Sequence, residues 1–134
     1  MSRELLWLTL TIALTALIWV PYILDRIRVR GLMATLANPS RRDKEQSPWA
    51  VRMMFAHDNA VQNLVVFAPL VLIADVLNVR NGITAAACAL YFWSRVAHVV
   101  IYTLGWPVGR TLAFVGGFIA QVMLLIEVLR FAYQ

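Results

Sequence analysis

Four long apolar runs constrain the fold of this chain more than any other feature of its sequence. The first, residues 5–24, has about the twenty residues that a helix needs to cross the hydrocarbon core of a bilayer. Hydrophobic residues make up 61% of the 134 residues, more than a soluble domain carries. The sequence therefore predicts a single-domain, all-α integral membrane protein, residues 1–134, built as a four-transmembrane-helix bundle. We expect the helices at about 5–36, 49–77, 80–104 and 108–131, with a kink near Pro21 in the first.

The one long polar connection, residues 31–48, predicts the orientation of the chain. It carries Arg41, Arg42 and Lys44, and loops rich in basic residues stay on the cytoplasmic side of a membrane. We therefore expect this loop to be cytoplasmic and both termini to lie on the opposite side. The membrane is then the inner membrane of a bacterium or the endoplasmic reticulum of a eukaryote. In this orientation the polar side chains gather at the cytoplasmic end, and the outer half of the bundle has few groups for chemistry.

The third expected helix carries a polar face inside an apolar run. At about 100° per residue, Arg95, His98 and Tyr102 fall within an arc of roughly 60°. A charged side chain in hydrocarbon costs at least about 2.5–3.5 kcal/mol on insertion scales. This face is therefore expected to line the interior of the bundle or a wet cavity.

The second expected helix offers a matching polar face in its first half. Arg52, Asn59 and Asn63 lie within roughly 40° of one another, and Gln62 lies about 60–80° to the side. His57 lies off this face, and a contact between helices is its more common role. Two polar faces at one membrane depth are expected to meet each other or to surround a shared ligand.

Arginine makes up eleven of the twelve basic residues, and the formal net charge is +5. Arg28, Arg52, Arg95 and Arg110 are all expected at the cytoplasmic end, where Asp58 alone cannot neutralise them. Uncompensated buried charge is costly, so the excess predicts an anionic ligand. The alternative is that these residues only join helices, at about 0.6 kcal/mol for each polar contact. The basic residues lie in one loop and inside helices, so no nucleic-acid partner is expected, and no metal-ligand spacing is present.

Two segments resemble the helix signatures of one family. Residues 52–63, RMMFAHDNAVQN, are similar to the helix-two signature of the MAPEG superfamily, the membrane-associated proteins in eicosanoid and glutathione metabolism. Residues 95–102, RVAHVVIY, followed by residues 105–111, GWPVGRT, resemble its helix-three signature. That second segment is most like the microsomal prostaglandin E synthase and microsomal glutathione transferase branches. Length, four spans and the basic first loop agree, so the resemblance covers essentially the whole chain.

The resemblance implies a homotrimer of four-helix subunits with glutathione bound between neighbours near the cytoplasmic face. The residues that it implies for glutathione binding are Arg28, Arg52, Asn59, Gln62, Arg95, His98 and Tyr102. It places Arg110 and Thr111 beside the glutathione sulfur. Gln62 stands where the family usually has a glutamate that pairs with the positive end of glutathione, and Phe55 stands where some members have an arginine.

The implied activity is glutathione-dependent transfer or peroxide reduction on a lipophilic electrophile that arrives through the lipid. A thiolate is the nucleophile in such reactions, and both a nearby cation and a helix N-terminus favour it over the thiol. Arg110, at the expected start of the fourth helix, would supply both effects. The alternative is a non-catalytic lipid-binding or scaffold protein of the same family. The presence of Gln62 at the position of the usual glutamate favours this alternative.

Overall fold

The computed structural model describes residues 1–133, of which 83% are helical. Its helices are α1 (Arg3–Leu17), α2 (Trp19–Arg30), α3 (Leu32–Leu36), α4 (Pro48–Val76), α5 (Gly82–Leu104) and α6 (Pro107–Ala132). Four stretches are long and apolar enough to cross a membrane: Arg3–Arg30, which contains α1 and α2, and the helices α4, α5 and α6. The predicted all-α membrane bundle is therefore confirmed.

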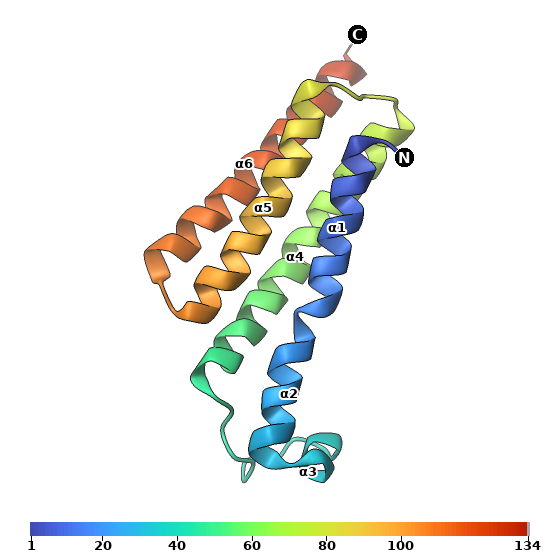
Figure 1. Cartoon of the computed structure of the whole chain (residues 1–134). Helices are drawn as coiled ribbons and strands as arrows, with labels where there is room; N and C mark the ends of the chain where they lie inside the picture. The colour runs from blue at the N-terminus through green and yellow to red at the C-terminus, as the bar shows by residue number, and fades with distance from the viewer. Residues whose placement is uncertain (134) are drawn as a thin grey trace.

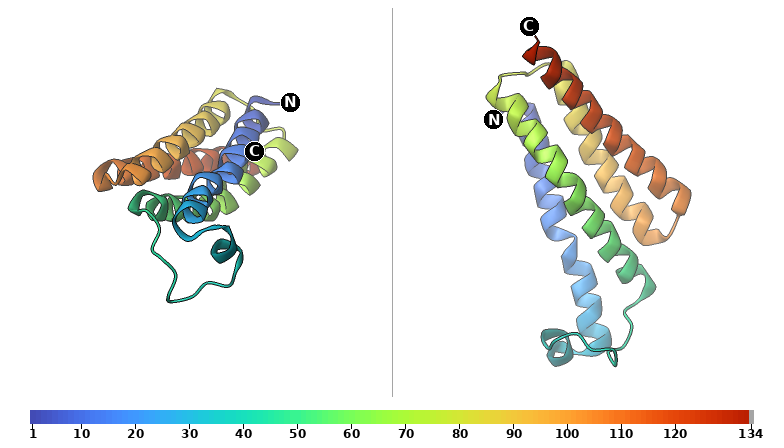
Figure 2. Two further views of the ribbon diagram at one scale, coloured as in Figure 1. Left: turned by 60° about the horizontal axis from the view of Figure 1, so that its bottom comes forward. Right: turned by 180° about the vertical axis from the view of Figure 1, so that it is seen from behind.

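The long helices run antiparallel to their neighbours in the chain, so the two termini lie at the same end of the bundle (Figure 1). We call this the terminal end. The opposite end, with α3, the 37–47 connection and the α5–α6 turn, is called the loop end. Figure 2 shows from behind that α5 and α6 form one hairpin, packed beside the pair made by α1 and α4. This arrangement brings the start of α4, the end of α5 and the start of α6 to the loop end.

The first span is not the continuous 5–36 helix expected from the sequence. It is interrupted at Ile18, between α1 and α2, and again at Gly31, between α2 and α3. Pro21 has no backbone N–H to give to the carbonyl of Leu17, and its ring crowds that carbonyl, which accounts for the first break. Gly31 has a φ of 83°, a left-handed conformation that glycine adopts without steric cost, and this accounts for the second.

The other helices begin and end within two residues of the expected positions, because the sequence marks their ends clearly. Proline occupies the first turn of both α4 and α6, where its missing N–H costs nothing. Asn81 and Thr84 form a capping box at the start of α5, in which each side chain binds a backbone N–H. Gly105, with a φ of 84°, ends α5 in the left-handed conformation.

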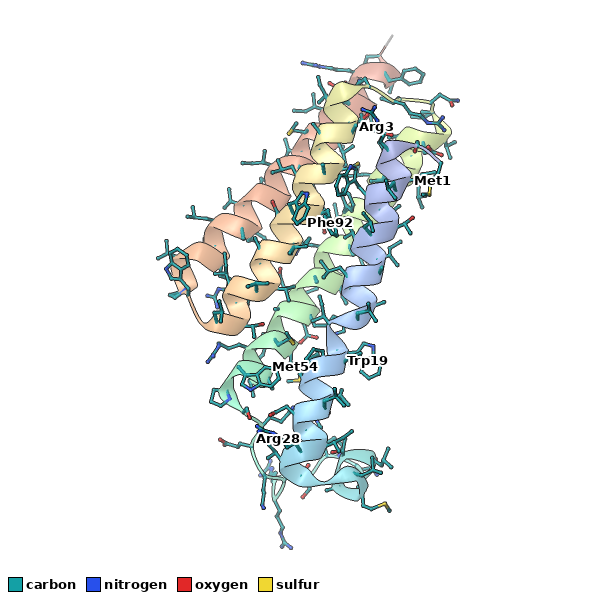
Figure 3. The ribbon with its side chains drawn as sticks, viewed as in Figure 1. Met1, Arg3, Trp19, Arg28, Met54 and Phe92 are labelled. Atoms are coloured by element: carbon teal, nitrogen blue, oxygen red, sulfur yellow. The ribbon has the colours of Figure 1, made fainter. Side chains whose placement is uncertain are left out.

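The core of the bundle is built around an aromatic stack. The rings of Phe67 on α4 and Tyr91 on α5 lie 3.7 Å apart and nearly parallel, at an interplanar angle of 9°. Leu8, Val71 and Leu124 pack in the same buried cluster. Large apolar side chains also point outward along the helices, as Trp19 does in Figure 3. Val65, for example, is 69% exposed. Such a surface is suited to lipid rather than to water.

The terminal end is more polar than the sequence predicted. The buried carboxylate of Glu4 accepts a hydrogen bond from the Thr84 hydroxyl and thereby ties α1 to α5. Glu127 on α6 accepts hydrogen bonds from Asn81 at 2.7 Å and Arg130 at 3.1 Å. Thr84 and Asn81 lie at the start of α5, away from the helices that carry these acids, so a single-helix periodicity could not identify them. Arg130, three residues after Glu127 on α6, is the exception. These contacts connect three of the helix ends.

Candidate functional site

Two small adjoining cavities lie at the loop end, between α4, α5 and α6. The Arg52 cavity, of about 140 Å³, is lined by Arg52, Tyr102, Gly105, Trp106, Pro107 and Arg110. The Asn59 cavity, of about 170 Å³, is lined by Asn59, His98, Tyr102, Arg110, Thr111 and Phe114. Arg110 and Tyr102 belong to both: the guanidinium carbon of Arg110 lies 4.4 Å from the centre of the Tyr102 ring. A cation over an aromatic face is stabilised there, so this pair is the fixed feature common to the two cavities.

The α5–α6 turn places the side chains of the pair. His98 and Tyr102 are four residues apart on α5, and their rings meet edge to face at 5.5 Å. After the turn at Gly105, Pro107 starts α6, and the backbone N–H of Arg110 donates to the Trp106 carbonyl. Arg110 therefore lies in the first turns of α6. Backbone N–H groups and the positive end of the helix dipole favour an anion at this position.

Arg52 reaches from α4 to the C-terminal end of α5. Its Nε donates a hydrogen bond of 2.9 Å to the carbonyl oxygen of Thr103, one of the last carbonyls of α5, which lack partners within the helix. The guanidinium lies against Gly105, where a Cβ would come within 3.2 Å of Arg52 Nε. Gly105 thus ends α5 and also makes room for Arg52, whose remaining N–H donors face the cavity region.

Arg95 is buried behind the Asn59 cavity. It is 1% exposed, and its Nη1 donates to Oδ1 of Asn59 at 3.1 Å. The guanidinium carbon lies 5.4 Å from the centre of the Tyr91 ring and 5.7 Å from that of Phe114. Nε and Nη2 of Arg95, together with Nδ1 of the buried His98, have no hydrogen-bond partner within residues 1–133. Unsatisfied polar groups therefore lie in and directly behind the wall of this cavity, which His98 lines and Arg95 does not.

Positive charge at the two cavities is not balanced by acids. Arg52, Arg95 and Arg110 make no ion pair in the part of the chain that the structure describes. Their hydrogen-bond and ring partners are neutral. Three uncompensated arginines at the loop end of a membrane bundle point to an anionic ligand, since isolated charge in a low-dielectric region is costly.

Two larger hollows differ from these cavities because an acid lines each of them, Glu4 in one and Glu45 in the other. One, of about 470 Å³, lies at the terminal end and is lined by Arg80, whose guanidinium pairs with Asp75 at 2.9 Å. The other, of about 570 Å³, lies between α2 and α4 and is lined by Arg30, which pairs with Asp43 at 3.3 Å. Arg80 and Arg30 are thus neutralised, although Arg3 in the first hollow and Arg26 in the second make no ion pair among the described residues. No acid lines the smaller cavities, so they are the better candidates for an anion site.

A comparison with protein families decides what kind of protein has this site. The model of the MAPEG family matches residues 5–130, nearly the whole chain. The chain belongs to the MAPEG family. The family includes glutathione-dependent transferases and related enzymes, and its fold is a membrane bundle. A search of curated proteins and a search of solved structures found no match to the chain.

This MAPEG chain brings most of the sequence-predicted site residues together. Those that line one or both cavities are Arg52, Asn59, His98, Tyr102, Arg110 and Thr111. The hydroxyl of Thr111 donates to the Pro107 carbonyl at 3.0 Å, so its oxygen is left to accept a hydrogen bond from the cavity. Gln62 is exposed on α4 and lines neither cavity.

Arg28 differs from the other predicted arginines because an acid neutralises it. Its Nη2 lies 3.0 Å from the buried carboxylate of Asp25, and it also donates to the Ser47 hydroxyl at 3.2 Å. Figure 3 shows Arg28 near the bottom of α2, at the start of the 31–47 region. The sequence argument, which counted Asp58 as the one acid available to four arginines, was wrong on this point. The spacing of three residues between Asp25 and Arg28 was the signal that could have corrected it.

His57 serves as a contact between helices, and two aromatic residues line the cavities. The phenol oxygen of Tyr22 lies 2.9 Å from Nδ1 of His57, so His57 joins α4 to α2, the role that its position off the polar face favoured. Phe114 and Trp106 line the cavities but were not identified from the sequence. Phe114 lies one helical turn after Arg110, and that spacing could have identified it.

Proposed function

We propose that this MAPEG protein binds glutathione at the two cavities and uses it for transfer to, or reduction of, a lipophilic substrate in the membrane. One observation carries the proposal: three arginines without acidic partners gather there, and one of them lies at the start of α6. Glutathione carries two carboxylates and a thiol that is a nucleophile when ionised, so it matches a site of this charge.

The residues present fit such a ligand. Arg52 has free N–H donors beside its bond to Thr103, and arginine suits bidentate binding of a carboxylate. Asn59, His98 and Tyr102 add neutral polar groups around the same space. Each cavity is smaller than the roughly 300–1,000 Å³ of a typical ligand pocket. The complete site is therefore proposed to include a surface from a neighbouring subunit.

Arg110 is proposed to act at sulfur. Bound glutathione would supply a thiol, and Arg110 together with the N-terminus of α6 would favour its thiolate over its neutral form. In a transfer reaction one carbon–sulfur bond forms, the electrophile's leaving group departs with the bonding electrons, and the thiol proton goes to water. In peroxide reduction two thiols and one hydroperoxide give one disulfide, one alcohol and one water. Thr111 would hold the region around Arg110 by its bond to Pro107.

Titration calorimetry with glutathione and a turnover assay on the purified protein test the proposal together. The assay uses glutathione with a chloronitrobenzene or an organic hydroperoxide. Binding with turnover of either substrate supports the enzyme. If the protein neither binds glutathione nor turns over a substrate, that result contradicts the proposal. It favours the alternative function, a non-catalytic lipid-binding or scaffold protein. The observation behind that alternative is Gln62, a neutral amide in place of the family's usual glutamate. Binding without turnover of either substrate favours a vestigial site.

We also predict that the protein is a homotrimer. Asp58 and Gln62 are exposed on α4, and Asp58 lies about 15 Å along that helix from its start at 1.5 Å per residue. A charged or amide group facing lipid at such a depth is costly, so protein should cover this face. Native mass spectrometry of the detergent-solubilised protein should give particles of three chains. A folded monomer at the same concentration would contradict the prediction.

Gln62→Glu should tighten glutathione binding about fivefold. If the ammonium group of glutathione lies at this position of a neighbouring subunit, a carboxylate would replace an amide as its acceptor. A charge-assisted hydrogen bond contributes about 1.5–3 kcal/mol, against about 0.5–1.5 for a neutral one, and a difference of roughly 1 kcal/mol is about fivefold. Calorimetry at low and high salt should show a larger gain at low salt. Unchanged or weaker binding would mean that the ligand lies elsewhere.

Labelling of introduced cysteines should show that the loop end is cytoplasmic. In a Cys88→Ala background, an impermeant thiol reagent should label Ser40→Cys only from the cytoplasmic side and Tyr133→Cys only from the other. Both positions are exposed, so accessibility within the protein does not limit the reaction. The physical basis is the retention of basic loops on the cytoplasmic side. The reverse labelling pattern would overturn both the topology and access of the site to cytoplasmic glutathione.

A further inference from the structure

We infer that Arg95 is a positioning residue: it fixes the side-chain amide of Asn59 so that an N–H donor, and not an oxygen, faces the Asn59 cavity. The inference rests on the proposed function, because this donor is assigned to an anionic acceptor atom of glutathione, a carboxylate oxygen or the thiolate sulfur. It gives Arg95 a role that involves no contact with the ligand.

Burial separates Arg95 from the ligand space. The residue is 1% exposed and lines neither cavity, whereas Asn59, which it contacts, is half-buried and lines one of them. Arg95 can therefore influence a ligand in the cavity by its charge or through Asn59, but not by a direct hydrogen bond from this position.

Two donors fix the orientation of the Asn59 amide. Arginine has N–H donors and no acceptor, so the Asn59 atom that faces Arg95 Nη1 at 3.1 Å must be the oxygen. Nδ2 of Asn63 donates to the Asn59 backbone oxygen at 2.9 Å and also lies 3.3 Å from the same side-chain oxygen. A backbone carbonyl only accepts, so this Asn63 atom is the nitrogen. Both contacts hold the Asn59 oxygen away from the cavity and leave its NH₂ group for a ligand.

Gly117 on α6 allows Arg95 to take this position. A Cβ at Gly117 would lie 2.6 Å from Arg95 Nη2 and 3.1 Å from its Cζ, so the guanidinium rests directly on the helix backbone. The preceding residue, Gly116, is a matched control. A Cβ there would lie 2.7 Å from the Ser94 hydroxyl oxygen, and no atom of Arg95 is among its near neighbours.

The substitution Asn59→Asp distinguishes a role of Asn59 in orienting a donor toward glutathione from a role in folding. Aspartate has the volume of asparagine and keeps an acceptor for Arg95, now as an ion pair, but it places a carboxylate oxygen where the NH₂ group was. We expect glutathione to bind at least tenfold more weakly by calorimetry, a change of about 1.4 kcal/mol. The thermal unfolding temperature should be unchanged or higher, because the charge of Arg95 gains a partner. A residue with only a structural role would not give this combination.

Substitutions at Gly117 and Gly116 test whether the position of the Arg95 guanidinium matters, without removing its charge. Gly117→Ala should push the guanidinium from Asn59 and weaken glutathione binding about tenfold, whereas Gly116→Ala should change it less than twofold. Equal losses in the two variants, or wild-type affinity in Asn59→Asp, would overturn the inference while glutathione binding by the wild type still stands. If the wild type itself binds no glutathione, the proposed function fails and the inference fails with it.

Discussion

Replacing Arg110 with alanine should lower the turnover number with glutathione and a chloronitrobenzene by about a hundredfold at neutral pH. Removing one preorganised donor from a site of developing charge typically costs about 10²–10³ in rate. Arg110 is held over the Tyr102 ring in the first turns of α6, so it and the helix N-terminus act on the same region. Arg110→Lys keeps the charge but not the planar group, and it should retain more activity than the alanine variant.

The pH profile identifies how Arg110 acts. A free thiol has a pKa of roughly 8.5, and the thiolate fraction rises with pH. If Arg110 favours the thiolate, glutathione bound to the wild type is already a thiolate at neutral pH. The loss of turnover number in Arg110→Ala should then become smaller as the pH approaches and passes the pKa of the free thiol. Arg130→Ala removes an exposed arginine at the terminal end and is the matched control. Its turnover number should equal that of the wild type at every pH. A deficit that stays constant from neutral to alkaline pH would assign Arg110 another role.

The fold was largely predictable because the bilayer sets the length of its elements. A span needs about twenty apolar residues, and the prolines and glycines at Pro48, Gly105 and Pro107 mark where helices begin and end. The break at Ile18 was less accessible to sequence reasoning. Pro21 predicts a disturbance, but whether a helix bends or divides there depends on how the neighbouring helices pack.

The features of the site that could be predicted are those set by the periodicity of a single helix, such as the face on which a residue lies. Helical spacing correctly placed Arg95, His98 and Tyr102 on a face of α5 that points into the bundle. The depth of each residue on that face could not be derived in this way. Arg95 lies behind the cavity because Gly117 on another helix leaves it room.

Backbone acceptors are a second kind of contact that side-chain patterns do not reveal. Arg52 binds the carbonyl of Thr103, and the sequence shows no signal for that bond because every residue has a carbonyl. The bond forms because α5 ends there and leaves its last carbonyls free. The side chain that performs this role also lines a cavity, so its contributions to structure and to binding must be separated by experiment.

Arg52→Ala should weaken glutathione binding by roughly ten- to a hundredfold while leaving the turnover number at saturating glutathione nearly unchanged. A hydrogen bond to a charged group contributes about 1.5–3 kcal/mol, which spans this range of affinity. Arg52 lines the cavity beside Arg110 but is anchored to the end of α5, so we expect it to bind a carboxylate equally in the ground and transition states. An interaction of that kind changes the apparent affinity and not the rate.

Arg52→Lys and Arg80→Ala complete the experiment. Lysine keeps the charge but lacks the fork and the Nε donor that binds Thr103, so its affinity should fall between those of the wild type and the alanine variant. Arg80 is paired with Asp75 at the terminal end, and its removal should leave glutathione binding unchanged. Thermal unfolding of each variant shows whether loss of the bond to α5 has destabilised the bundle. A fall in turnover number with unchanged affinity would place Arg52 at the sulfur and require a different position for the carboxylates of glutathione.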